Sequence, residues 1–381
     1  DETAINYRNG GWDKEITGIW VAKFEAGYAG GNNTATAVAS SVNYTENTSW
    51  VKSIELHGNT TTGDGSGDAR NWLDGIYGKT TAIKYPVFQP TTYSMNYINH
   101  NDAYNIAKAL SESGNPYGFT GAADSHLMKN SEWGAVAYLS KSAYGLGSAD
   151  IMVNNITLNS GGQQRTETAG KHEVDSVYGV TGCTTGSTSS GEKQTTIASI
   201  NATTGNTAQD GVYTWDQQGG TSASSTGTIY GIYDLSGGLW ERTTGYVANG
   251  KGQLKSYGSS IAYEGDTLKT ISTKYTTVYP HNNTYDSTSI SDTETNLNAA
   301  STNNWIANTL IYGDAIRETS TQGTGSYSWH NDGSNFPGLY YPFSVRGGHY
   351  FYDTSAGLFY FGRHNGRSHY YSGFRAVVVV S

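Results

Sequence analysis

Residues 233–241 read YDLSGGLWE, residues 125–133 read SHLMKNSEW, and the C-terminal part carries RGG at 346–348 and GFR at 373–375. Two long stretches outside these segments, 146–228 and 250–335, are dominated by Gly, Ser, Thr, Asn and Gln. A structureless connection of that length is unusual inside a compact domain. We therefore expect one domain over residues 1–381, with irregular insertions at 146–228 and 250–335 that pack against it.

The composition is that of a folded chain with a polar but weakly charged surface. Charged residues make up 14% of the 381 residues, against about 25% in a typical soluble domain. The 30 Tyr and 9 Trp argue against disorder, because disordered chains are poor in aromatic residues. A net charge of −9 excludes a nucleic-acid binder that depends on a basic face.

The single cysteine, Cys183, excludes an intramolecular disulfide framework and a thiolate metal cage. No run of residues approaches the roughly 20 apolar positions of a membrane span, so we expect no direct membrane insertion. The chain starts at Asp1 without Met or a signal peptide, which indicates a processed or truncated form.

Five segments have patterns typical of regular structure. Bulky side chains alternate in strands, apolar side chains recur at helical spacing in helices, and Ser, Asn and Asp often precede a helix. The predicted elements are a strand over 18–25, a helix over 103–111 capped by Asn101 and Asp102, a helix over 132–139 after Ser131, a strand over 356–361 with Phe359 and Phe361 on one buried face, and a buried final strand over 376–380.

In chain order, the segments SHLMKNSEW, YDLSGGLWE and RGG…GFR resemble motifs of the formylglycine-generating enzyme/sulfatase-modifying-factor family. The first resembles its Arg-Leu-Pro-Thr-Glu-Ala-Glu-Trp helix start, the second its Asp-x-x-Gly-Asn-Val-Trp-Glu-Trp turn, and the third its closing Arg-Gly-Gly-Ser-Trp … Gly-Phe-Arg signature. The likeness spans about residues 19–380. It implies an α+β, C-type-lectin-like fold of the formylglycine-generating-enzyme type, with long irregular insertions.

The chain departs from that family at the residues on which its enzymes depend. Those enzymes use C-terminal cysteines as copper-binding, substrate-engaging thiols, whereas Cys183 lies in the first insertion. In the YDLSGGLWE turn, Gly238 stands where the family has Asn, and Arg242 stands where it has the final Trp. A copper site on paired thiolates cannot be built from one cysteine. We therefore expect no enzymatic activity and no required cofactor.

Residues 349–372 read HYFYDTSAGLFYFGRHNGRSHYYS, a mixture typical of binding surfaces. Tyr supplies contact area at low entropic cost, Arg supplies forked hydrogen bonds, and Ser, Asn and Gly adapt to different partners. Every His, Tyr, Phe, Asp, Ser, Gly and Arg in it can also be reached from an asparagine codon by changing only adenines. Lys, Glu, Gln, Met and Trp cannot be reached in this way, and none occurs in residues 347–373.

These features together resemble the variable proteins of diversity-generating retroelements, which mutate template adenines to rewrite a C-terminal cassette on a C-type-lectin-like scaffold. The resemblance implies a variable ligand-binding segment at 346–375, with its variable positions on one exposed face. Tyr350 stands where that family often has a fixed aromatic residue, and its role stays open. The implied ligand-binding positions are His349, Phe351, Tyr352, Asp353, Ser355, Tyr360, Gly362, Arg363, His364, Arg367, His369, Tyr370, Tyr371 and Ser372.

Two possible metal sites can be named from the sequence. His349, His364 and His369 have the side chain that metals bind most often, but they lack a fixed spacing, and we expect exposed contacts instead. Asp234 and nearby carbonyl oxygens could hold a structural Ca²⁺, which prefers oxygen ligands.

Other charged residues are expected to be structural. Arg346 and Arg375 should pair with buried acceptors. Glu132 and Glu241 each stand beside a Trp inside a fold motif, which favours a structural role over a pair of catalytic carboxyl groups. Residues 124–126, Asp-Ser-His, have the residue types of a hydrolase triad, but triad members are assembled by the fold rather than as sequence neighbours.

We therefore expect a non-enzymatic, extracellular binding protein on a bacterial cell surface or a phage virion. Its partner would be a protein or glycan receptor on another cell surface. Two alternatives stay open. A divergent enzyme of the formylglycine-generating family would be indicated by a bound copper ion or by a buried His–carboxylate pair in a cleft. A glycan lectin without diversification would be indicated by Ca²⁺-dependent sugar binding.

Overall fold

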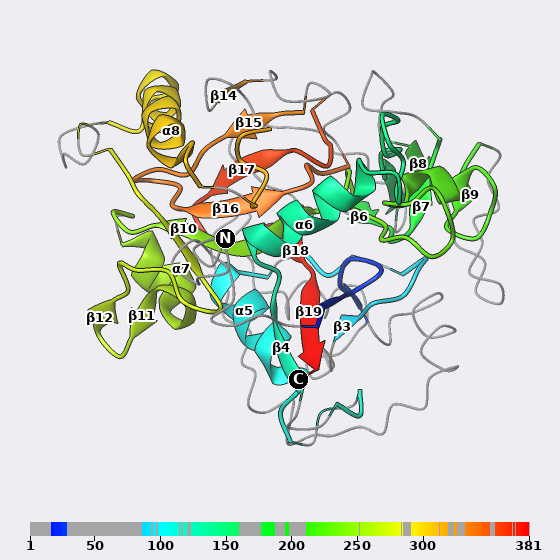
Figure 1. Cartoon of the computed structure of the whole chain (residues 1–381), viewed down its shortest axis with the longest axis horizontal. Coiled ribbons are helices and arrows are strands. Elements are labelled where there is room, and N and C mark those ends of the chain that lie inside the picture. Colours follow the sequence, from blue (N-terminus) through cyan, green and yellow to red (C-terminus); the bar gives the residue numbers. More distant parts are fainter. Residues whose placement is uncertain are drawn as a thin grey trace.

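The computed structural model describes residues 17–28, 86–92, 94–96, 98–113, 115, 117–119, 123–159, 177–186, 195–197, 211–250, 252–282, 284, 291–311, 313–318, 324–325, 332–350, 355–367, 369 and 371–380. Within these residues the chain is a mixed α+β protein with four α-helices and several small sheets (Figure 1). None of the helices in this part of the chain has both the length and the apolar character needed to cross a bilayer.

The largest sheet contains the two ends of the C-terminal segment. Its strands are β10 (Trp240–Val247), β13 (Thr277–Tyr279), β14 (Thr324–Gly325), β15 (Ser334–Asn335), β16 (Phe343–Arg346), β17 (Phe361–His364) and β18 (Ser372–Phe374). The order is β13-β10-β16-β17-β15-β14, and β18 pairs with β10. Glu241 of β10 lies opposite Arg346 of β16 and opposite Gly373 of β18. The YDLSGGLWE, RGG and GFR segments therefore meet at one point of this sheet.

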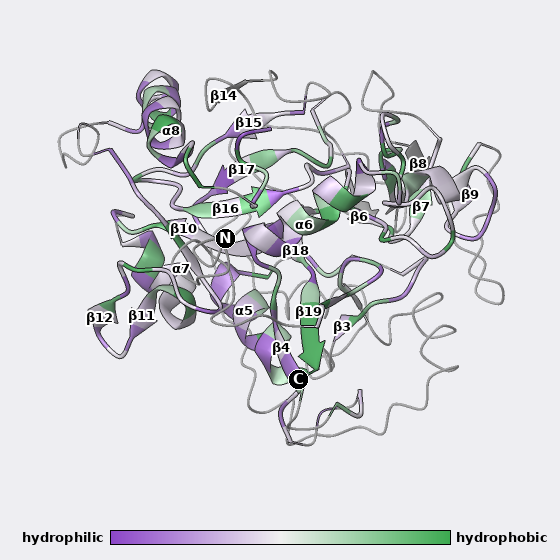
Figure 2. Ribbon diagram, viewed as in Figure 1, coloured by the Kyte–Doolittle hydropathy of each residue, from purple (hydrophilic) through white to green (hydrophobic). Residues whose placement is uncertain are grey.

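A second, three-stranded sheet has the order β1-β19-β4, with β1 (Trp20–Val21), β19 (Ala376–Val380) and β4 (Ala123–Leu127). β19 is uniformly hydrophobic in Figure 2 and is buried except at Val380, which confirms the predicted final strand. The strand predicted over 18–25 is shorter than expected. Only two residues pair, and Trp20 on this edge strand is 74% exposed.

The two predicted helices are present with shifted boundaries. α5 (His100–Ala109) begins earlier than predicted, because Asn99 is the N-cap residue and its Oδ1 accepts a backbone N–H of the first turn at 2.8 Å. Asn101 instead accepts the backbone N–H of Ser260 at 2.8 Å. α6 (Asn130–Ser140) begins two residues earlier than predicted, because Lys129 and not Ser131 is its N-cap residue, and its apolar residue Trp133 is fully buried.

The polar stretch 250–335 contains regular structure that the sequence analysis did not predict. It forms α7 (Gln253–Ala262), β11 (Tyr263–Glu264), β12 (Thr267–Leu268) and α8 (Glu294–Asn308), besides β13, β14 and β15. α8 has a polar inner face, where Ser301 Oγ donates to Phe336 O at 2.7 Å and Asn304 Nδ2 donates to Pro337 O at 2.9 Å. Such a face has no apolar periodicity, so the usual helix signal is missing.

The other polar stretch, 146–228, also contains short elements in its described part. They are β5 (Ile156–Asn159), β6 (Val177–Gly179), β7 (Cys183–Thr184), β8 (Thr195–Ile197), β9 (Tyr213–Thr214) and the 3₁₀ turn η2 (Gly220–Ala223). β5 pairs with β6 and β8, and β7 pairs with β9. A further pair near the N-terminal part is β2 (Gly27–Tyr28) with β3 (Pro86–Val87).

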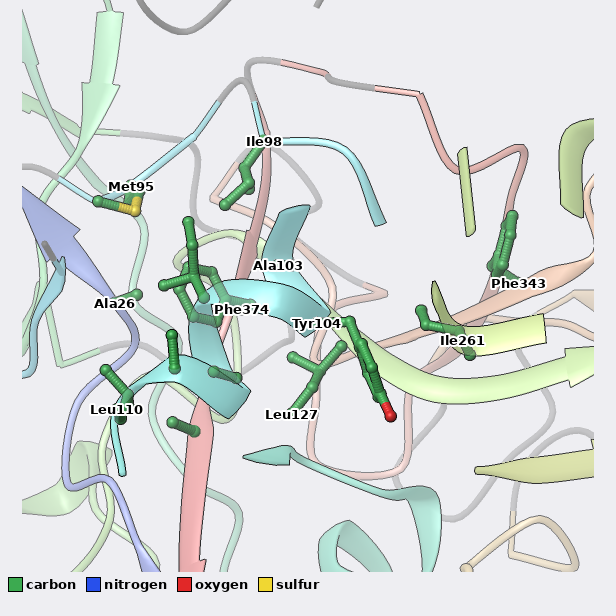
Figure 3. Close-up of a cluster of buried hydrophobic side chains, with 14 of the residues drawn as sticks. Ala26, Met95, Ile98, Ala103, Tyr104, Leu110, Leu127, Ile261, Phe343 and Phe374 are labelled. Atoms are coloured by element: carbon green, nitrogen blue, oxygen red, sulfur yellow. The ribbon is translucent and has the colours of Figure 1, made fainter. Parts of the chain in front are cut away.

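Two hydrophobic clusters join these elements. In the first, Ala103 of α5, Leu127 of β4 and Phe374 of β18 meet side chains from α7 and β16 (Figure 3). In the second, Trp133 packs with residues that include Phe359 and Val377 of β19.

Phe361 belongs to a third cluster, with Phe336 and Tyr279. The prediction that Phe359 and Phe361 share one face is therefore wrong. β17 begins only at Phe361, so the alternation of a strand does not extend back to Phe359.

Candidate ligand-binding site

The structure describes most of the C-terminal segment, defined here as residues 346–375. Phe351, Tyr352, Asp353 and Tyr370 lie outside the described residues. β17 pairs antiparallel with β16, so the middle of the segment belongs to the main sheet. The described candidate positions lie before β17, within it, in the turn after it and at the start of β18: His349, Ser355, Tyr360, Gly362, Arg363, His364, Arg367, His369, Tyr371 and Ser372.

The segment begins at a tight glycine turn. Gly347 and Gly348 have φ values of 83° and 76°, in the left-handed region that residues with a Cβ disfavour. A Cβ on Gly348 would lie 2.5 Å from the Cα of Ala356. The turn is held against the YDLSGGLWE segment, because the Tyr350 N–H donates to Gly238 O at 2.8 Å. The backbone path at this end is therefore fixed.

The segment ends at a buried ion pair. Arg375 Nη2 lies 2.5 Å from Glu241 Oε1, and Nε donates to Glu241 Oε2 at 2.9 Å. The same guanidinium donates to Tyr233 O at 2.7 Å and to Ala22 O at 2.6 Å. Both charged groups are fully buried. The structural roles predicted for Arg375 and Glu241 are confirmed.

Arg346 also has the structural role that was predicted. Its side chain is fully buried and donates to Asp314 O at 3.3 Å. The guanidinium lies over the ring of Phe361 at 4.8 Å and near that of Trp133 at 5.6 Å, a cation–π arrangement. Arg346 therefore supports the core under the segment and does not contact a ligand from the surface.

Five candidate side chains converge on Trp240, the first residue of β10, and we call this group the Trp240 cluster. His349, Tyr371, His364 and Tyr360 have ring centroids 4.9, 4.7, 6.1 and 6.3 Å from that of Trp240. His369 joins through Tyr371, at 3.7 Å between centroids. Residues from both ends of the segment therefore form one continuous aromatic group.

Burial divides the candidate positions into two sets. His349, Tyr360, His364 and Ser372 are buried, and Ser355, Arg363, Arg367, His369 and Tyr371 are partly exposed. The expectation of exposed histidines is wrong for His349 and His364, because their rings pack in the Trp240 cluster. A Cβ on Gly362 would lie 2.8 Å from Val345 Cγ2. Position 362 therefore has no room for a larger side chain without rearrangement.

The rest of the chain holds this segment through its backbone. Carbonyl oxygens are the same for every amino acid, so such hydrogen bonds survive a change of side chain. The four donors come from three parts of the fold, the loop before β15, α6 and β10: Gly333 N–H to Ser355 O (2.8 Å), Trp133 Nε1–H to Leu358 O (2.8 Å), Trp240 N–H to Tyr371 O (2.8 Å) and Arg242 Nη2–H to Arg367 O (2.6 Å).

Arg363 points away from the Trp240 cluster, toward α8. Its Nη1 donates to Leu297 O at 2.7 Å and to Ser301 Oγ at 2.6 Å, and its Nη2 lies 3.3 Å from Glu294 Oε1. A small pocket opens beside it, lined by residues that include Leu297 and Ala300 of α8 and Leu339. Because its donors already bind α8, we interpret Arg363 as a link between the segment and that helix.

Asp234 lies in a setting unlike a calcium site. Its Oδ1 accepts hydrogen bonds from Gly182 N–H and Asn154 Nδ2, each at 2.8 Å, and Oδ2 accepts from Glu25 N–H at 3.3 Å. Burial raises the pKa of its carboxyl group. No group of three or more His, Cys, Asp or Glu that could hold a metal occurs among the described residues. These donors occupy the oxygens that a Ca²⁺ ion would need.

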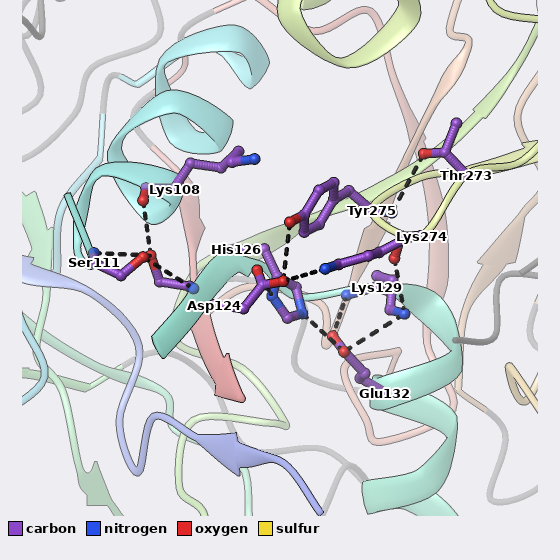
Figure 4. Close-up of polar contacts among 10 residues, drawn as sticks. Lys108, Ser111, Asp124, His126, Lys129, Glu132, Thr273, Lys274 and Tyr275 are labelled. Atoms are coloured by element: carbon purple, nitrogen blue, oxygen red, sulfur yellow. Dashed lines mark hydrogen bonds and ion pairs between the residues drawn. The ribbon is translucent and has the colours of Figure 1, made fainter. Parts of the chain in front are cut away.

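The residues of the triad-like sequence 124–126 lie in a buried polar network (Figure 4). His126 Nε2 lies 2.8 Å from Glu132 Oε1, and His126 Nδ1 lies 3.7 Å from Asp124 Oδ1. Ser125 points to the other side of β4, where its Oγ donates to Lys108 O at 2.8 Å. The three residues therefore form no hydrolase triad.

The His126–Glu132 pair is a buried His–carboxylate pair of the kind named above for a divergent enzyme. Both side chains are buried, and Glu132 Oε2 also accepts the N–H of Lys129, the N-cap residue of α6, at 2.9 Å. Although burial lowers the pKa of His126, the neighbouring Glu132 and Asp124 raise it above its ordinary value. The pair joins β4 to the start of α6, which confirms the structural role predicted for Glu132.

Sequence reasoning missed two residues of the site, Trp240 and Arg242. Both stand in or next to the YDLSGGLWE segment, outside the segment 346–375 that the sequence predicts as the binding segment. Arg242 differed from the family pattern, and that departure was the available signal. Trp240 offered no such signal, because its contacts come from residues more than 100 positions away in the sequence.

Comparison with known proteins adds no family assignment. No family model matches the chain, and no curated protein matches its sequence.

Proposed function

We propose that this chain is a non-enzymatic binding protein with a C-type-lectin-like scaffold of the formylglycine-generating-enzyme type, and that residues 346–375 form a ligand-binding segment diversified by a retroelement. One observation carries the proposal: four donors from the rest of the fold end on backbone carbonyl oxygens of the segment. A segment held in this way can exchange side chains and keep its path. A diversified binding face requires this property, because affinity depends on preorganised side chains.

The contact residues of this face are the partly exposed Arg367, His369 and Tyr371. His369 and Tyr371 belong to the Trp240 cluster, and Arg367 lies in the turn that precedes them. Tyr and Arg are the side chains that most often dominate binding energy at protein interfaces. The partner is a protein or glycan receptor on another cell surface, and the chain acts outside the cell, on a bacterial surface or a phage virion.

The test is to sequence the gene and its surroundings in several sibling isolates. The proposal requires substitutions concentrated in the 27 codons for 347–373, and a nearby near-copy of this segment with adenines at the variable codons. It also requires a neighbouring reverse transcriptase gene. Residues 123–149, a fully described stretch of equal length, provide the matched control window.

Two results would contradict the proposal. In the first, the codons for 347–373 vary no more than those of the control window. In the second, they vary but no adenine-bearing template exists, so that ordinary selection explains the variation. Ca²⁺-dependent sugar binding together with the first result would favour the glycan lectin.

A further inference from the structure

Arg242 is a fully buried cation that forms hydrogen bonds to residues of this site. It lies on β10, and among the described residues all of its hydrogen bonds go to neutral acceptors: Ile98 O (3.0 Å), His100 Nδ1 (3.3 Å), His364 Nδ1 (3.3 Å) and Arg367 O (2.6 Å). Burial lowers its pKa to about 9, so it stays charged at neutral pH. A buried charge must be well hydrogen-bonded to be tolerated, and this one bonds two separate parts of the chain.

The hydrogen bonds of the two histidines are consistent with this arrangement. His100 Nε2 lies 2.7 Å from Thr243 O, a carbonyl that can only accept, so its Nδ1 is the acceptor for Arg242. His364 Nδ1 also accepts the Gly366 N–H at 2.9 Å. Both rings therefore carry their proton on Nε2. Burial, and then the charge of Arg242, lower the pKa of each ring well below its ordinary value.

The bonds connect the start of α5 to the turn 364–367 of the C-terminal segment. Besides Arg242, the His100 N–H donates to Gly366 O at 2.8 Å. Gly366 has a φ of 95°, and a Cβ there would lie 2.5 Å from the ring of Phe343. The turn is therefore fixed in position immediately before the partly exposed His369 and Tyr371.

We propose that Arg242 is a positioning residue that fixes the turn 364–367 of the binding segment, and that His364 is its hydrogen-bond acceptor and not a ligand contact. Arg242 reaches Arg367 through the backbone carbonyl, so the side chain at 367 can change freely. It reaches His364 through the ring nitrogen, so position 364 needs an acceptor side chain. The inference rests on the proposed function for the role of the segment, but the bonds themselves can be tested without a ligand.

The first experiment is amide hydrogen exchange on the whole chain with Arg242→Lys. Lysine keeps the charge but donates from one atom and cannot reach acceptors on both sides. We expect exchange at Gly366 and His100 to accelerate by about tenfold or more, with β19 amides unchanged. Arg363→Gln is the matched control: it removes another arginine of the segment and should affect only amides of α8. Unchanged exchange at Gly366 and His100 would overturn the proposal.

A second pair of variants decides the matter if Arg242→Lys does not fold. His364→Asn keeps a side-chain acceptor and His364→Phe keeps a ring without one. We expect accelerated exchange at Gly366 and His100 in the Phe variant and wild-type exchange in the Asn variant. In the wild type, ¹⁵N chemical shifts should place the His364 proton on Nε2. A proton on Nδ1, or identical behaviour of the two variants, would refute the role of His364. Neither result depends on sibling gene sequences, so this inference and the proposed function can fail separately.

Discussion

Asp332 should make the free energy of unfolding fall as the pH rises through neutrality, and Asp332→Asn should remove that dependence. Its carboxyl group is buried and accepts the Phe359 N–H at 2.8 Å. Burial, assisted by the charge of Asp150 and opposed by Lys141 and Arg346, raises its pKa from 3.8 to about 8. Between these values the folded chain holds a proton that the unfolded chain has released.

The sign and size of the effect follow from proton linkage. Stability falls with pH wherever the folded state binds more protons, by at most about 1.4 kcal/mol per pH unit for one group. Between pH 5 and pH 7 the wild type should therefore lose roughly 2–3 kcal/mol relative to Asp332→Asn. Asparagine mimics the neutral acid and can still accept the Phe359 N–H. Urea unfolding, followed by tryptophan fluorescence at pH 5, 6 and 7, measures this difference.

Asp266→Asn is the control, because Asp266 is fully exposed. The hydrogen bond and charge of Lys255 lower its pKa, so it is ionised in both states and should add no slope over this range. A difference between wild type and Asp332→Asn that stays flat from pH 5 to pH 7 would refute the reasoning. It would mean that the Asp332 carboxyl group is ionised in the folded chain at pH 5.

Three further substitutions test the ends of the segment and α5 by the same unfolding assay. Arg375→Met leaves Glu241 buried without its partner and should cost about 3–5 kcal/mol; a loss near zero would contradict the buried ion pair. Gly348→Ala places a Cβ 2.5 Å from Ala356 at a φ of 76° and should cost about 1–3 kcal/mol; wild-type stability would show that the turn can shift. Asn99→Ala removes the cap of α5 and should cost about 1 kcal/mol, whereas no loss would place the cap elsewhere.

Elements with a strong local pattern could be predicted from the sequence. The aliphatic run of β19 and the apolar pattern of α6 give correct elements, because local propensity and burial agree there, although α6 is capped at Lys129 and not at Ser131. α8 could not be predicted, because three of its four buried residues, Ser301, Asn304 and Asn308, are polar. Its position depends on hydrogen bonds to Phe336 O and Pro337 O, which are tertiary contacts.

The sequence indicates where the candidate site lies, but it does not show which of its residues are buried and which are exposed. Residue types indicated the segment 346–375, and the RGG and GFR motifs gave its ends. They could not tell that His364 is buried beside Arg242 while Arg367, three positions later, is partly exposed. That difference arises because β17 ends at His364 and the chain turns at Gly366, which has a φ of 95°, before it reaches Arg367.

Together, these contacts imply that the positions of the segment 346–375 tolerate substitution to different degrees. Where the rest of the chain bonds a backbone carbonyl, as at Arg367, a change of side chain leaves that bond in place. Where it bonds or encloses the side chain, as at His364 and Gly362, only a hydrogen-bond acceptor or a glycine preserves the packing. A mutational process that randomises all of these codons equally would therefore yield folded proteins whose observed variation is unequal, greatest at the positions that only the backbone anchors.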